Sequence, residues 1–211
     1  MNKLFFSVLF SSTFFLHSQE TVTSQLDSIT NTFQAEEYLL SLNSKENKFI
    51  VFNQEKHKTA LAEKLFSRSS GGTLVVENEV EKVHYKIVET SFITHYRVSY
   101  IYLDGKKLPE SEISALRRSI MSQYKDGVPF DYLAKKYSMD GNANRGGDLG
   151  WFAKGEMHPI FEDTIIGTTA NVDDTFTVDI EDRQWYYVVL KTFEPKDIKE
   201  IKVLKVVEHK S

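Results

Sequence analysis

The residues best suited to chemistry lie in one block of the sequence, YSMDGNANRGGDLGWFAKGEMHPIFE, which runs from Tyr137 to Glu162. This block holds an aspartate, Asp140, and three apolar side chains of different shape. Leu149 offers an aliphatic wall, Met157 an adaptable thioether and Phe161 an aromatic ring. Together they predict an apolar pocket with one or two polar groups, a kind of site that binds a ligand without a metal ion or a cofactor.

Each of these residues also has a purely structural interpretation. Leu149, Met157 and Phe161 would fit equally well in a plain hydrophobic core. Asp140 precedes Gly141, where an aspartate commonly caps a turn. Phe152 is a further substrate-binding candidate, at the rim of the pocket or in the core beneath it.

The block resembles the parvulin family of peptidyl-prolyl cis-trans isomerases over four stretches. They are Tyr137–Asp140 (YSMD), Arg145–Phe152 (RGGDLGWF), Gly155–Met157 (GEM) and Pro159–Glu162 (PIFE). The resemblance places Leu149, Met157 and Phe161 at the family's proline-binding positions. It places Asp140 at the position of the family's catalytic cysteine or aspartate.

Two positions depart from the family pattern. Parvulins carry a histidine on each of two adjacent strands beneath the pocket, and this chain has Tyr100 and Tyr187 at those positions. A neutral phenol can donate and accept a hydrogen bond near neutral pH, so the two tyrosines are candidate catalytic residues beside Asp140. His158, next to the predicted pocket, is interpreted as a surface histidine.

The predicted pocket fits the reaction that the resemblance implies. Rotation about an X–Pro bond has a barrier of about 20 kcal/mol because amide resonance must be broken. No bond to the substrate is made or cut, so a protein can help by gripping the proline ring and favouring the twisted amide. We therefore expect an isomerase or foldase that acts on exported, proline-containing polypeptides and uses no metal and no cofactor. The alternative is a parvulin-fold binding module with little or no turnover, serving as a chaperone or as a subunit of a periplasmic secretion or outer-membrane assembly complex.

Strands and helices that would position the block are evident on either side of it. Arg97–Leu103 (RVSYIYL) and Trp185–Phe193 are rich in β-branched and aromatic residues, which favours strands. Apolar residues at helical spacing predict helices over Ser111–Tyr124, Pro129–Tyr137 and Pro159–Ile166. The order predicts an α+β, parvulin-like domain in which a small, mostly antiparallel sheet is flanked by helices.

A smaller region of helices and strands precedes this domain. Helical spacing extends from Val22 to Leu42 and over Gln54–Arg68, and Asn47–Phe52 resembles a short strand. Val75–Val88 is rich in β-formers, as is the basic stretch Ile201–Val207 near the C-terminus. The region and the C-terminal tail are candidates for a second unit that binds a client or an assembly.

The N-terminus has the layout of an export signal. Lys3 precedes a short apolar stretch, Leu4–Leu16, after which the sequence becomes polar. This stretch is shorter than the ~20 residues of a membrane span. We predict a cleaved signal peptide over residues 1–18, an accessory region over 19–95, the isomerase domain over 96–194 and a tail over 195–211. The alternative for residues 1–18 is a buried N-terminal helix.

Composition restricts the remaining function classes. The net charge is −4 and no basic stripe is present, so we expect no nucleic-acid partner. The absence of cysteine excludes disulfides, thiol chemistry and thiolate metal sites. No later segment is apolar enough to suggest a transmembrane span. We expect an exported, periplasmic protein.

Overall fold

A computed structural model describes residues 21–210. The predicted signal peptide lies outside these residues. The helices are α1 (Val22–Ser28), α2 (Thr32–Leu42), α3 (Ala60–Phe66), α4 (Glu110–Lys125), α5 (Phe130–Tyr137) and α6 (Pro159–Gly167), with short 3-10 helices η1 (Gly141–Arg145) and η2 (Glu181–Arg183). The strands are β1 (Lys48–Asn53), β2 (Thr73–Glu77), β3 (Glu81–Asp104), β4 (Asp148–Ala153), β5 (Thr175–Ile180), β6 (Trp185–Lys191) and β7 (Lys196–His209). The predicted α+β class is confirmed.

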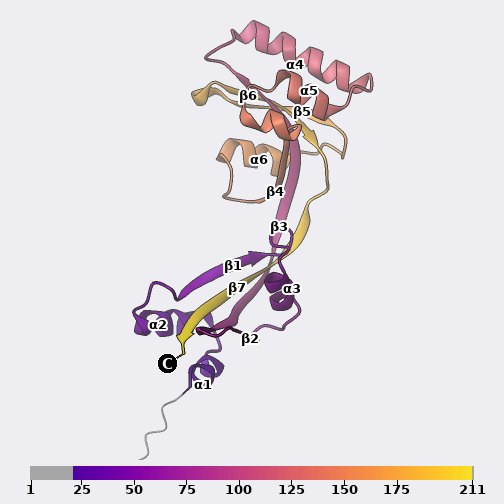
Figure 1. Cartoon of the computed structure of the whole chain (residues 1–211). Helices are drawn as coiled ribbons and strands as arrows, with labels where there is room; N and C mark the ends of the chain where they lie inside the picture. The colour runs from indigo at the N-terminus through magenta and orange to yellow at the C-terminus, as the bar shows by residue number, and fades with distance from the viewer. Residues whose placement is uncertain (1–20, 211) are drawn as a thin grey trace, which may run out of the picture.

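One long strand, β3, organises the whole fold. It has 24 residues and runs from one end of the molecule to the other (Figure 1). Its first part pairs with β2 and β7, and its last part pairs with β4 and β6, all antiparallel. The result is a single seven-stranded sheet with the order β1-β7-β3-β6-β5, in which β2 and β4 pair with the other edge of β3.

The N-terminal unit consists of α1, α2, α3, β1, β2, β7 and the first part of β3. Helix α3 covers one face of this part of the sheet, where Leu65 packs with Ile87 and Ile201. Helices α1 and α2 cover the other face, where Leu26 packs with Leu204. The residues predicted as a tail therefore form a strand, β7, that lies between β1 and β3.

The parvulin-like unit consists of α4, α5, α6, β4, β5, β6 and the last part of β3. Helices α4 and α5 pack on one face of β3 and β6, in a core that includes Ile101, Ile120 and Leu133. Helix α6 packs on the opposite face, where Phe161 and Ile165 are buried with other apolar side chains of the sheet. The glycine-rich block lies between α5 and α6 and contributes β4.

Local capping explains where some elements are shorter than predicted. The helical stretch from Val22 to Leu42 is broken by Asn31, whose side chain accepts a hydrogen bond from the Gln34 amide and starts α2. Helix α3 begins only at Ala60, because Thr59 accepts from the Ala62 amide as an N-cap. The helix predicted from Gln54 onward was wrong over its first turn and a half.

Candidate functional site

A pocket of about 200 Å³ opens in the parvulin-like unit. Strands β3, β4, β5 and β6 and the start of α6 supply its walls. The lining residues are Tyr100, Leu149, Met157, His158, Phe161, Ile180, Trp185 and Tyr187. The pocket therefore brings together the predicted Leu149, Met157 and Phe161 with the two tyrosines.

A buried carboxylate holds the loop that carries Met157. Glu162 is only 3% exposed and accepts hydrogen bonds from the amides of Gly155, at 2.8 Å, and Met157, at 2.7 Å. Burial alone would raise the pKa of Glu162, but these backbone hydrogen bonds outweigh it and the pKa is lowered. The ionised side chain thus fixes the backbone on either side of Glu156 and positions Met157 at the pocket.

Tyr100 and Asp140 form a hydrogen-bonded pair behind the pocket wall. The Tyr100 hydroxyl donates to Asp140 Oδ2 at 2.8 Å, and the Ser138 hydroxyl donates to Asp140 Oδ1 at 2.9 Å. Ser138 in turn accepts from the Tyr102 amide at 3.0 Å. Both carboxylate oxygens are therefore bound by residues anchored to β3, and the Asp140 side chain does not cap the following turn.

Tyr187 meets Tyr100 through its ring rather than through its hydroxyl. The two rings are edge to face with centroids 5.5 Å apart, and Phe161 packs on both, at 5.1 Å from Tyr187 and 6.0 Å from Tyr100. Among residues 21–210, no partner accepts or donates a hydrogen bond at the Tyr187 hydroxyl. Of the two tyrosines, only Tyr100 is hydrogen-bonded to the third catalytic candidate, Asp140.

Both phenols remain neutral well above physiological pH. Burial raises the pKa of Tyr100 far above its ordinary value, and the hydrogen bond and negative charge of Asp140 raise it further. Burial also raises the pKa of Tyr187 to about 12, with smaller contributions from Tyr102 and Asp140. The site therefore presents hydroxyl groups and not phenolates.

Two features fix β4 against β3 beneath the pocket. Gly147 has φ +82°, and a Cβ at this position would lie 2.5 Å from the Tyr100 carbonyl oxygen, so only glycine fits. Arg97 forms a bidentate ion pair with Asp148, with Nη2 2.6 Å from Oδ2 and Nε 3.1 Å from Oδ1. Asp148 also accepts a hydrogen bond from the Gly150 amide at 2.9 Å, which fixes this turn.

Two of the predicted site residues do not line the pocket. Asp140 reaches it only through Tyr100. Phe152 is 1% exposed and pairs with Tyr96 in the β3–β4 ladder, in the same apolar cluster as Phe161. Phe152 therefore takes the core position of its two predicted positions.

The pocket also contains residues that the sequence interpretation missed. His158 was interpreted as a surface residue, but it lines the pocket with its ring edge to face against Trp185, 6.1 Å between centroids. Trp185 precedes Tyr187 by two positions in β6, so the two side chains share a face of the sheet. Ile180 pairs with Trp185 across the β5–β6 ladder. The two-residue period of a strand was the signal that could have identified Trp185.

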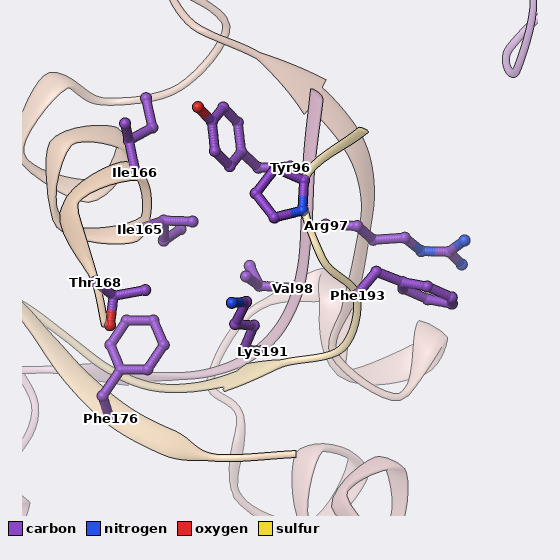
Figure 2. A pocket seen from close by; sticks show the side chains of 10 residues that line it. Tyr96, Arg97, Val98, Ile165, Ile166, Thr168, Phe176, Lys191 and Phe193 are labelled. Atoms are coloured by element: carbon purple, nitrogen blue, oxygen red, sulfur yellow. The ribbon is translucent and has the colours of Figure 1, made fainter. Parts of the chain in front are cut away.

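A smaller cavity lies beside the C-terminal part of α6, where Ile165 and Ile166 line it (Figure 2). Its volume is about 40 Å³, and Tyr96, Ile165, Phe176 and Lys191 are among the residues around it. This space admits no more than a few water molecules, since one water needs ~10–15 Å³. A proline side chain with its flanking peptide cannot enter there. The 200 Å³ pocket is the candidate site because it brings together Leu149, Met157 and Phe161.

Residues 21–210 contain no group of three or more histidine, cysteine, aspartate or glutamate residues placed to hold a metal ion. No helix in this part of the chain is long and apolar enough to cross a membrane.

The pocket is lined mainly by apolar side chains, and the two tyrosines beside it, Tyr100 and Tyr187, are neutral. The family model of the PPIC-type PPIASE domain matches residues 82–191, just over half of the 211-residue chain. The chain belongs to this family of peptidyl-prolyl isomerase domains, and the predicted resemblance to parvulins is confirmed.

Curated relatives share only part of their length with this chain. It is similar to the chaperone SurA of Cupriavidus metallidurans, with 41% identity over 58 residues that make up 28% of this chain and 12% of the relative. It is also similar to the foldase protein PrsA of Bacillus subtilis, with 35% identity over 100 residues, 46% of this chain and 30% of the relative.

Solved structures of the same family are also similar. The crystal structure of PrsA from Bacillus subtilis matches with 30% identity and a TM-score of 0.38, over 47% of this chain and 35% of that chain. The solution structure of NmPin, the parvuline of Nitrosopumilus maritimus, matches with 30% identity and a TM-score of 0.37, over 47% of this chain and 97% of that chain.

Proposed function

We propose that this protein is a peptidyl-prolyl cis-trans isomerase that acts on exported polypeptides. One observation carries the proposal: the apolar pocket places the hydroxyl-bearing Tyr100 ring, oriented by Asp140, against the walls formed by Leu149, Met157 and Phe161. A proline ring fits among these walls, and the Tyr100 hydroxyl, whose proton is donated to Asp140, can accept a hydrogen bond from a backbone N–H next to the proline. Family membership and the names of the relatives, a chaperone and a foldase, support the same activity.

The geometry supports the following roles for the catalytic candidates. Asp140 acts by orienting Tyr100, because its carboxylate contacts the tyrosine and does not line the pocket. Tyr187 and Phe161 confine the Tyr100 ring from the side, so the hydroxyl has a defined direction. The pocket favours the twisted amide over the planar one by excluding water and fixing the proline ring.

Catalysed exchange between the cis and trans isomers of an X-Pro tetrapeptide, followed by NMR, tests this activity. Uncatalysed isomerisation takes tens to hundreds of seconds, and we expect the protein to make it faster. The acceleration should saturate as the peptide concentration rises. Saturable binding with no acceleration would instead identify the binding module, whose role is to hold proline-containing segments for a chaperone or an assembly complex.

We propose further that the substrates are met outside the cytoplasm, in the periplasm, since the N-terminal layout with Lys3 and Leu4–Leu16 is that of a secretory signal. The intact mass of the protein recovered from its host tests this. We expect the mass of a chain whose first residue lies near Gln19. The mass of a chain that still contains residues 1–18 would contradict export.

A further inference from the structure

The edge of β3 that pairs with β2 and β4 is open along its middle. β2 pairs with β3 as far as Lys86, and β4 begins to pair at His95. Within residues 21–210, β3 from Glu89 to Thr94 has a ladder partner only in β7, on its opposite side. The open edge, residues 88–94, is about 23 Å long.

Backbone alternation identifies which groups face this gap. On the β2 side, the Ile87 amide donates to Gly72 O at 2.9 Å, and the Ile87 carbonyl accepts from Gly71 N at 3.0 Å. The next residues contain a β-bulge, where the register shifts between Ile87 and Glu89. Such a bulge moves the alternation by one residue, so even-numbered residues face this edge beyond it.

The far end of the gap agrees with this assignment. The Tyr100 amide donates to Gly147 O at 2.9 Å, on the β4 side. Counting back in steps of two, Thr90, Phe92 and Thr94 direct their N–H and C=O groups into the gap. A row of unpaired donors and acceptors of this kind is a template for another strand.

Two neighbouring side chains beside the gap are apolar and exposed. Phe92 is 66% exposed on one face of the sheet, and Ile93 is 36% exposed on the other. Lys199, which pairs with Phe92 in β7, directs its Nζ to the Phe66 carbonyl at 3.3 Å and leaves the gap side clear. A strand added here would cover Phe92 through a cross-strand contact.

The flanking strands restrict what can occupy the gap. A second copy of the chain would present a β3 of 24 residues, which would collide with β2 and β4 because they occupy the same position beside β3. Only a short extended segment that leaves the sheet at both ends can enter. Unfolded polypeptide supplies such segments, whereas a folded protein with long strands does not.

We propose that the open edge of β3 binds an extended segment of unfolded polypeptide by strand addition, through the backbone of Thr90, Phe92 and Thr94. The preferred segment places an apolar side chain opposite Phe92 and has no proline facing β3, because proline lacks the donor. The edge lies about 26 Å along β3 from Tyr100, so one client chain can reach both the edge and the proline pocket.

Amide hydrogen exchange measured by NMR tests the proposal, with the proline-free peptide Ac-KTVTVTK-NH2 as the probe. In the free protein, the amides of Thr90, Phe92 and Thr94 should exchange at least 100-fold faster than those of Ser91 and Ile93, which face β7. Saturating peptide should slow the three gap-facing amides at least 10-fold. The same peptide with N-methylated amides at adjacent central residues, which cannot form a ladder, should leave them unchanged.

Three results would overturn the proposal. Peptide that saturates the protein without slowing the gap-facing amides binds elsewhere. Slow exchange that depends on protein concentration would assign the edge to a second copy. Slow exchange in the free protein that is lost when residues 1–20 are removed would assign it to the chain's own N-terminal segment.

A matched pair of variants isolates the backbone from the side chain. Phe92→Pro removes one gap-facing N–H, and Phe92→Ala removes only the ring. We expect the proline variant to bind the peptide at least 10-fold more weakly than the alanine variant, and equal affinities would count against strand addition. Neither variant should change cis/trans exchange in a proline tetrapeptide, so the edge and the isomerase pocket are tested separately. If Phe92→Pro does not fold, the exchange experiment decides alone.

Discussion

Replacing Tyr100 by phenylalanine tests the centre of the proposed mechanism. The substitution removes one hydroxyl, and with it the 2.8 Å hydrogen bond to Asp140, while the ring can keep its contacts with Phe161 and Tyr187. A hydrogen bond to a charged group contributes about 1.5–3 kcal/mol. If the transition state depends on it, kcat/KM should fall by about 10- to 150-fold.

The neighbouring ring provides a matched control. Tyr187→Phe removes the same group from a side chain whose hydroxyl has no hydrogen-bond partner among residues 21–210. We expect this variant to retain its exchange activity within about threefold of the wild type, since little beyond solvation is lost. Both variants should be compared by NMR exchange in a proline tetrapeptide, with thermal unfolding to confirm that each is folded.

The result that would refute this reasoning is specific. If Tyr100→Phe accelerates cis/trans exchange to the same extent as the wild type does, the Tyr100 hydroxyl has no role in catalysis. Its orientation by Asp140 then has no catalytic effect. If both phenylalanine variants lose activity equally, the effect belongs to pocket polarity in general and not to the Tyr100–Asp140 pair.

Three further predictions follow from the pocket and its supports. Met157→Ala should weaken binding of proline peptides with little change in thermal stability. Phe161→Ala, at a site only 5% exposed, should lower the free energy of unfolding by ~3–5 kcal/mol. Equal stability losses in the two variants would show that Met157 is a core residue too. Gly147→Ala should destabilise the fold by at least ~1–3 kcal/mol in denaturant unfolding and reduce exchange activity, because its Cβ would press on the Tyr100 carbonyl; an unchanged midpoint would contradict the close approach. The free energy of unfolding should fall as pH rises from about 10 through about 12, since the folded state holds the Tyr187 proton more tightly than the unfolded chain does. Tyr187→Phe should reduce this alkaline loss of stability, followed by circular dichroism. The same loss in the variant and the wild type would argue against burial of Tyr187 as the cause.

The sequence was most informative where a local motif specifies a local shape. Leu149, Met157 and Phe161 converge on one pocket because the turn and helix between them are short and are fixed by local groups such as Glu162. For Phe152 the motif left the rim and the core open, because motif membership does not say how far along β3 a residue pairs. His158 was missed because a single histidine carries no periodicity that indicates which way it faces.

Long-range pairing was the part that local patterns could not supply. From Glu81 to Asp104 the sequence contains no glycine or proline and many β-formers, so one continuous strand was a readable signal. Nothing in the stretch Lys196–His209 specifies that it pairs with both β1 and β3, since partner choice depends on residues more than a hundred positions away. The open edge of β3 follows from that pairing and could not be predicted without it.

The position of β7 has a consequence for how this chain matures. In the part of the chain that the structure describes, β1 has β7 as its only ladder partner, and β7 follows the entire parvulin-like unit in the sequence. As a chain is synthesised or translocated from its N-terminus, the first residues to emerge must wait for Lys196–His209 before their sheet can close. The parvulin-like unit, whose strands and helices are contiguous from β3 to β6, can form its pocket earlier. The parvulin-like unit can thus fold before the N-terminal unit that precedes it in the sequence. Until β7 is present, Phe52 and Leu65 of the N-terminal unit lack their core contacts with Ile201 and Val203.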